Sequence, residues 1–148
     1  MLSGKLIHLI EAHQEQIVTS VIHEIRQHPD LTHMHKLPDA ELRERGRLIL
    51  ENLGHWLAGH QEEIGSRYET LGKDRFEENI PLTESVRALC IIKDKMTDFV
   101  RGQGASKMLE LYAEEELELR VSRFFDTLVI HMVRGYETAW RRTSHAFA

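Results

Sequence analysis

The fold of this chain is decided by residues 117–140, which read LELRVSRFFDTLVIHMVRGYETAW. The apolar side chains in this stretch recur at steps of three and four residues, the spacing that places them on one side of an α-helix. They are Leu117, Val121, Phe124, Phe125, Leu128, Val129, Met132, Tyr136, Ala139 and Trp140. A surface helix needs an apolar stripe of about 100°, and this set is wider. We therefore expect a long helix that is buried on more than one side.

The rest of the chain shows the same helical spacing. The last helix is expected to run from about residue 105 to 142, and any break in it is expected at the acidic run 114–116. No segment shows the period-two alternation that is typical of strands. The predicted fold class is all-α: one domain, residues 1–148, forming a globular bundle of five to six helices with a long C-terminal helix. The earlier helices are predicted at residues 2–27, 38–59, 61–79 and 83–101.

Prolines and small residues mark the predicted helix ends. Pro29 ends the first helix, because proline cannot continue the backbone hydrogen-bond ladder. Pro38 suits the first turn of the second helix, and Thr83 suits the N-cap of the fourth. Gly46 and Gly54 each cost the second helix about 1 kcal/mol relative to alanine. We expect close approach of a neighbouring helix to offset that cost.

The composition excludes several function classes. The chain has 148 residues, of which 41% are hydrophobic and 29% charged, as is typical of a globular domain. Its net charge is −5 and its acidic and basic residues are interspersed, so no basic surface for nucleic acid is predicted. No apolar run suits a membrane span or a signal peptide, and the lone Cys90 fits a reducing compartment. We expect a cytoplasmic protein without nucleic-acid or membrane partners.

The ten histidines are the unusual feature of the composition. His28, His33 and His35 lie with Asp30 in the predicted connector between the first two helices. Imidazoles beside a carboxylate can bind zinc, nickel or copper, but this spacing matches no standard zinc motif. We therefore favour a solvated loop and predict no metal ligands.

Three other histidines, His13, His60 and His131, fall on apolar faces of predicted helices. A histidine that faces an apolar cavity can ligate haem iron, and Phe125 and Met132 could line such a pocket beside His131. The simpler interpretation is a histidine at the edge of the core whose nitrogens are hydrogen-bonded. The identity of any cofactor is therefore not assigned, and haem bound by His131, His60 or His13 is kept as the alternative.

No catalytic motif is found in the sequence. Cys90 lies in an apolar stretch, where burial would leave its thiol unreactive. Asp94, Asp98 and the acidic run 114–118 have spacings that are typical of a solvated helix face. The sequence contains no nucleophile elbow and no phosphate-binding loop. We expect a protein that is not an enzyme.

Several segments resemble a known family, the N-terminal domain of RsbRD-type RsbT co-antagonists, which is also found at the front of bacterial sensor kinases. They are YETLGKDRF at 68–76, IPLTE at 80–84, VRA at 86–88, RFFD at 123–126 and GYE at 135–137. The resemblance implies a helical signal-input module that acts on an output domain, either a STAS domain or a histidine kinase. A related branch is globin-like without haem, so a globin-like arrangement is implied as an alternative. No output domain follows Ala148, and we expect it to be separate or absent.

The wide apolar face of the last helix predicts a homodimer. Phe125, Tyr136, Ala139 and Trp140 carry the apolar stripe close to the chain end, where only residues 143–148 remain to cover it. Aromatic residues are enriched in interface cores, and a two-fold contact needs only a self-complementary surface. We therefore predict that these four residues form the dimer interface.

Overall fold

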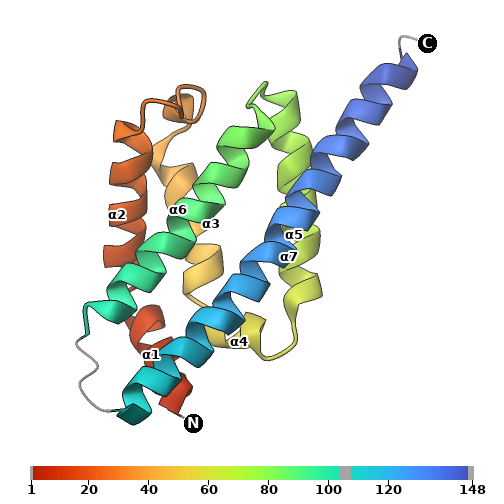
Figure 1. Ribbon diagram of the computed structural model, residues 1–148. Helices are drawn as coiled ribbons and strands as arrows, with labels where there is room; N and C mark the ends of the chain where they lie inside the picture. Colours follow the sequence, from red (N-terminus) through yellow and green to blue (C-terminus); the bar gives the residue numbers. More distant parts are fainter. Residues whose placement is uncertain (1, 104–107, 147–148) are drawn as a thin grey trace.

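The computed structural model describes residues 2–103 and 108–146, and all regular structure in these residues is helical. The predicted all-α class with a long C-terminal helix is confirmed, and Figure 1 shows the arrangement. The elements in chain order are α1 (Leu2–Ala12), α2 (Gln14–Gln27), the 3₁₀-helix η1 (Met34–Lys36), α3 (Asp39–Leu50), α4 (Leu53–Leu57), α5 (Gln61–Glu77), α6 (Leu82–Arg101) and α7 (Met108–Ala146).

The longer helices run alternately up and down in the bundle (Figure 1). In that view α2, α5 and α7 rise, while α3 and α6 descend between them. The short helices α1 and α4 lie at the lower end, and η1 lies at the upper end. The C-terminal part of α7 extends beyond the other helices (Figure 1). One end of the longest helix is therefore held by the bundle while the other projects from it.

The predicted helix over residues 2–27 is two helices, with the break at His13. The backbone of His13 leaves helical geometry (φ −110°, ψ 21°), and its ring Nδ1 lies 2.9 Å from the carbonyl oxygen of Leu9. Before this break, α1 packs on α4, where Glu11 accepts a hydrogen bond from the backbone N–H of Gly54 at 2.9 Å. The apolar spacing continues through His13, so the sequence pattern alone could not show the change of direction.

The predicted helix over residues 38–59 is also divided. It ends at Leu50, and after Asn52 (φ −121°, ψ 35°) the chain forms the short helix α4. The indole N–H of Trp56 donates to the carbonyl oxygen of Leu48 at 2.8 Å, which ties α4 to the end of α3. These two breaks account for seven α-helices in the described residues instead of the predicted five to six.

Two smaller predictions concern the start of α6 and a break in α7. Helix α6 begins at Leu82 with Pro81 at its N-cap, so Thr83 is inside the first turn and is not the cap. The fixed φ of Pro81 (−58°) already sets the entry of the chain into the helix. The described part of α7 is one helix, so the acidic run at 114–116 produces no break.

The expected close approaches at Gly46 and Gly54 are confirmed. A Cβ atom built at Gly46 would lie 2.9 Å from a methyl carbon of Val18, and one at Gly54 would lie 3.3 Å from a methyl carbon of Ile7. The neighbouring helices therefore use the space that a larger residue would occupy.

The core runs along the whole bundle and is closed by α7. The residues with no exposed surface include members of the stripe on α7 and their partners on the other helices, namely Val18, Ile49, Leu50, Leu53, Ile64, Phe124 and Leu128. Helices α5 and α7 make the most extensive contact between any two of the described elements. The position of α7 is therefore coupled most strongly to that of α5.

Candidate functional site

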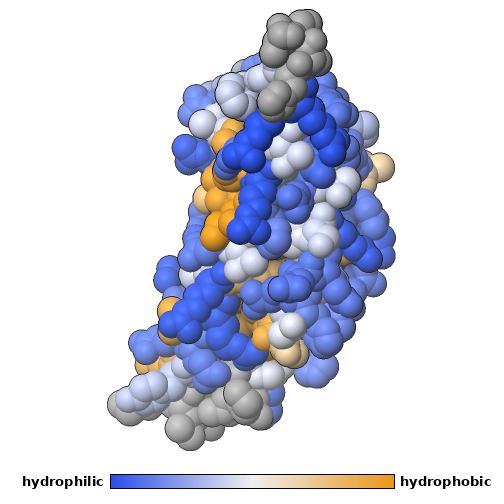
Figure 2. Space-filling model, turned by 90° about the vertical axis from the view of Figure 1, so that its right-hand side faces the viewer, coloured by the Kyte–Doolittle hydropathy of each residue, from blue (hydrophilic) through white to orange (hydrophobic). Residues whose placement is uncertain are grey.

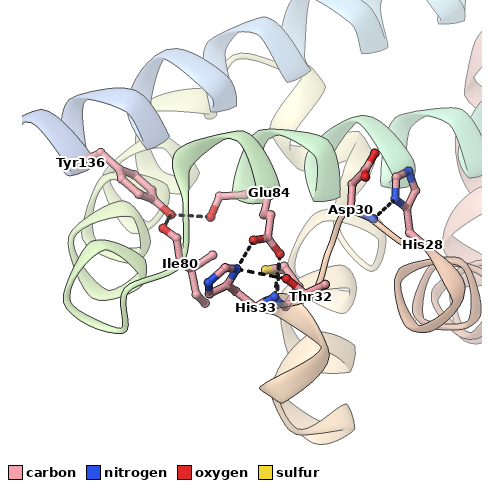
Figure 3. Close-up of polar contacts among 9 residues, drawn as sticks. His28, Asp30, Thr32, His33, Ile80, Glu84 and Tyr136 are labelled. Carbon is pink, nitrogen blue, oxygen red and sulfur yellow. Dashed lines mark hydrogen bonds and ion pairs between the residues drawn. The ribbon is translucent and has the colours of Figure 1, made fainter.

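A partly buried polar site joins three elements at the upper end of the bundle (Figure 3). His33 comes from the segment that enters η1, Glu84 and Ser85 from the first turn of α6, and Tyr136 from α7. We call these four residues, with the carbonyl group of Ile80, the polar junction. Figure 3 shows Glu84 pointing toward His33 and Tyr136 pointing toward Ile80.

Glu84 is the centre of the polar junction. It is 5% exposed, and its Oε1 accepts backbone hydrogen bonds from His33 at 3.0 Å and Met34 at 3.1 Å. Its Oε2 lies 2.5 Å from Nδ1 of His33. A buried carboxylate is costly unless its oxygens are hydrogen-bonded, and here both oxygens are. Glu84 therefore fixes the start of η1 against the start of α6.

Tyr136 links α7 to the same region. Its hydroxyl donates to the carbonyl oxygen of Ile80 at 2.9 Å and accepts from the hydroxyl of Ser85 at 2.6 Å. Its ring meets that of Phe76 edge-on, with the ring centroids 6.3 Å apart. Burial raises the pKa of Tyr136, and the hydrogen bond with Ser85 offsets this only in part. The neutral phenol thus holds α7 to the entry of α6.

Arg75 on α5 is the second buried charge near the polar junction. It is 3% exposed and donates to Glu41 at 2.6 Å and to Glu78 at 3.2 Å. Burial also raises the pKa of Tyr68, and the nearby positive charges of Arg45 and Arg75 offset this effect in part. The pairing of Arg75 therefore connects α3, α5 and the turn after α5.

A small cavity lies between α2, α3, α5, α6 and α7 beside these groups. Its volume is about 40 Å³, and Tyr68, Arg75, Ser85 and Met132 are among the side chains that line it. Small-molecule sites usually have volumes of roughly 300–1,000 Å³. The cavity has room for water but not for haem in this conformation.

The three histidines of the haem hypothesis lie in different surroundings. His13 is exposed at the junction of α1 and α2, where its ring lies 5.3 Å from that of Phe99. His60 is exposed at the N-cap of α5. His131 is half-buried on α7 with its ring against Gly65, where a Cβ atom would come within 2.5 Å of Nε2. The structure does not bring these three residues to one site, and the apolar-face prediction is wrong for His13 and His60.

The histidine-containing connector is ordered by hydrogen bonds. His33 bonds to Glu84, His35 Nε2 lies 2.7 Å from the carbonyl oxygen of Ile25, and Nδ1 of His28 accepts the backbone N–H of Asp30 at 3.2 Å. These imidazoles bond to different partners, and in the described residues they do not converge on a common point. The connector is therefore held against the bundle by hydrogen bonds, while His28 and His33 stay half-buried and His35 stays exposed.

The four residues of the predicted dimer interface are divided by the fold. Phe125, Tyr136 and Ala139 are buried within the chain's own core, whereas Trp140 is 60% exposed. The wide apolar face of α7 is largely used inside the bundle, because α7 packs on α1, α4, α5 and α6.

Sequence reasoning gave no role to Glu84, Ser85 or Arg75. A charged residue one turn into a helix is usually solvated, so no local signal distinguishes Glu84 from its exposed neighbours. The signal that could have found Glu84 and Arg75 is their position in the sequence, because both lie inside the segments that carry the family resemblance.

Comparisons with known proteins agree with that resemblance. No curated protein and no solved structure matched the chain significantly. None of the described helices is long and apolar enough to cross a membrane. The family described as the RsbT co-antagonist protein rsbRD N-terminal domain matches residues 15–146. The match covers α2 to α7 and includes the whole polar junction, so this chain belongs to the family of RsbRD N-terminal domains, a family of regulatory domains in stress signalling.

Proposed function

We propose that this chain is the signal-input domain of a bacterial stress-response protein and that α7 transmits the signal by a change in helix packing. Its output would be a STAS domain or a histidine kinase, attached or separate, in the cytoplasm. The family match supports a regulatory role. The argument for α7 as the transmitting element rests on its packing.

The observation that carries the proposal is the backbone contact between α5 and α7. A Cβ atom at Gly72 would lie 2.4 Å from the carbonyl oxygen of Met132, and one at Gly135 would lie 2.1 Å from the carbonyl oxygen of Glu69. Packed interfaces tend to have discrete arrangements and do not deform continuously. A shift of α5 at this contact would therefore move α7 as a rigid element.

The projecting end of α7 would carry that movement away from the bundle. The helix spans 39 residues, and its C-terminal part extends beyond the bundle (Figure 1). The large hydrophobic side chains that are exposed in the described residues all lie on α7: Leu111, Tyr112, Leu119, Ile130 and Trp140. With 3.6 residues per turn, they fall within one arc of about 100°. We call these five residues the outer face of α7.

The outer face of α7 is the proposed homodimer interface. Figure 2 shows one side of the molecule, where separate apolar groups lie within a largely hydrophilic surface. Of the four interface residues predicted from the sequence, Trp140 is exposed and would lie in this interface. Phe125, Tyr136 and Ala139 are buried and would contribute by holding α7 in place from the core side. A contact between two copies of one helix satisfies two-fold symmetry.

Sedimentation tests the dimer. The wild-type chain is expected to sediment as a dimer at micromolar concentration, and Ile130→Glu with Trp140→Glu should shift it to monomer with unchanged helical circular dichroism. Ala40→Glu is the matched control, because Ala40 is exposed on α3 and not on α7. A wild-type chain that sediments as a monomer would contradict the dimer.

The signalling role is tested separately in the host bacterium with a stress-response reporter. The double variant on the outer face should change the reporter output at equal protein level, whereas Ala40→Glu should not. Equal output from all three proteins would contradict transmission through this face.

A ligand-binding role through His131 is the second candidate function. The observation that favours it is the ring Nδ1 of His131, which is buried without a hydrogen-bond partner in the structure. The small cavity requires the helices to separate before haem could enter. A Soret band on purified protein that changes with His131→Ala would support haem binding, and a colourless protein after haem addition would contradict it.

A further inference from the structure

Three side chains that can ligate metals gather where α4 meets α5, at the opposite end of the bundle from the polar junction (Figure 1). His55 belongs to α4, His60 is the N-cap of α5, and Glu63 lies in the first turn of α5. One ligand atom from each lies within 4.8 Å of the other two, and all three residues are exposed. We call these residues the His-His-Glu cluster.

One distance in the His-His-Glu cluster is close to that between two ligands of a metal ion. Nε2 of His55 lies 3.1 Å from Oε2 of Glu63. Two ligand atoms in a tetrahedral zinc site, with bonds of about 2.0–2.1 Å, are separated by roughly 3.3 Å. The rings of His55 and His60 stack with centroids 4.1 Å apart and an angle of 8° between their planes. One ring must therefore turn out of the stack before both nitrogens can reach one ion.

The backbone explains why these residues meet. Gly59 has a φ of 112°, a conformation that residues with side chains rarely adopt, and this turn brings His60 back over His55. His60 and Glu63 are three residues apart at the start of α5, so they lie on the same side of the helix. The two elements thus supply one imidazole each to the same surface point.

We propose that His55, His60 and Glu63 bind a divalent transition-metal ion, and that Zn²⁺ is the ion that fits best. Two imidazoles and one carboxylate are typical zinc ligands, whereas Mg²⁺ and Ca²⁺ prefer oxygen ligands alone. Water completes the coordination, because the site is open to solvent. The exposed rings can turn out of the stack without disturbing the core.

Metal binding at this point would clamp α4 to the start of α5. The same region contacts α7, because Arg120 donates to the carbonyl oxygen of Leu57 at 3.4 Å. An ion that binds the folded chain in preference to the unfolded one raises its stability. Metal binding at the His-His-Glu cluster would not require the proposed signalling function, since it involves only these three side chains.

The test uses untagged full-length chain that has been stripped of metal with a chelator. Titration with ZnCl₂ in a calorimeter should give one Zn²⁺ per chain, and the thermal midpoint should rise with Zn²⁺. His60→Ala and Glu63→Gln should each weaken binding by more than about tenfold. CoCl₂ should give visible absorption bands of four- or five-coordinate Co²⁺ with the wild-type chain, and these bands should be lost in both variants.

His8→Ala is the matched control. His8 and Glu11 are also three residues apart on one helix, with 3.6 Å between Nδ1 of His8 and Oε1 of Glu11, but no second imidazole joins them. This variant should bind Zn²⁺ like the wild type. Circular dichroism verifies that every variant is folded. Absence of saturable binding, or equal affinity of wild type and His60→Ala, would overturn the proposal.

Discussion

Gly72 and Gly135 face each other where α5 crosses α7, and a Cβ atom added at Gly135 would lie 2.9 Å from the Cα of Gly72. The two backbones are therefore in direct contact without intervening side chains. Just beyond this crossing, Phe76 and Tyr136 continue the contact between the same helices. The glycine pair thus sets the distance at which α7 reaches the polar junction.

Gly135→Ala should destabilise the protein, because the added methyl group would meet the carbonyl oxygen of Glu69, a backbone atom that cannot move without shifting α5. Overpacking of this kind costs about 1–3 kcal/mol, and urea unfolding measures the loss. Gly4→Ala is the control, because a Cβ atom there meets nothing within 4 Å. At Gly4, alanine should leave stability equal or raise it by up to about 1 kcal/mol. Equal stability of Gly135→Ala and the wild type would contradict the close crossing.

Glu84→Ala should also destabilise the chain, because it leaves the backbone N–H groups of His33 and Met34 without their acceptor. An unpaired buried group costs about 1–3 kcal/mol. Glu84→Gln should lose less stability than Glu84→Ala, since the amide oxygen still accepts a hydrogen bond. Glu44→Ala, on the exposed surface of α3, should change stability by less than about 0.5 kcal/mol. If Glu84→Ala left the thermal midpoint unchanged, the carboxylate would not be needed to order the connector.

Phe124→Ala and Leu128→Ala should each cost about 2–5 kcal/mol, because both side chains have no exposed surface and lie in the middle of α7. Chemical denaturation gives the two values. Glu44→Ala provides the comparison, since Glu44 is exposed on α3. A loss below about 0.5 kcal/mol for either core variant would mean that this side of α7 is not buried in solution.

Stability should fall when the pH rises above about 10, because burial raises the pKa of Tyr68 and Tyr136 above the ordinary value of 10.0. Below that pH both phenols are neutral in the folded and unfolded chain, so they add no pH dependence. Above it, the unfolded chain releases protons that the folded chain retains, which favours unfolding. Urea unfolding at a series of alkaline pH values measures the slope.

Tyr136→Phe should make this alkaline loss of stability smaller. It should also lower stability at neutral pH by about 1–2 kcal/mol, because Ser85 and Ile80 lose their hydrogen-bond partner. Identical slopes for Tyr136→Phe and the wild type would contradict a titration of the buried phenol.

The residues around Phe124 and Leu128 show what local spacing can predict. Their three- and four-residue steps indicate a helix and its buried side whatever the partner is, because both properties follow from helix geometry. The breaks at His13 and after Leu50 could not be predicted in this way, since the apolar steps continue across them. They arise where Glu11 and Trp56 bond to neighbouring elements.

The candidate site was less predictable than the fold. His33 was found as a histidine of the connector, but its partner Glu84 lies 51 residues away, and only the packing of η1 on α6 brings them together. Trp140 was predicted to be an exposed interface residue, and it is exposed, but its neighbours Tyr136 and Ala139 turn into the core. A wide apolar stripe is expected both for a helix in a dimer interface and for a helix surrounded by its own bundle, so the sequence does not distinguish the two.

The sequence by itself determined the helical class, the long C-terminal helix and, through short segments such as that around Gly72, the family. These features depend on residues that are close in the chain. Only the tertiary structure decided that Gly72 meets Gly135, that Glu84 orders the connector, and that His60 stacks on His55. Each of these contacts requires a turn or a helix crossing to bring the two residues together, and a spacing rule for one helix contains no information about the direction of the next.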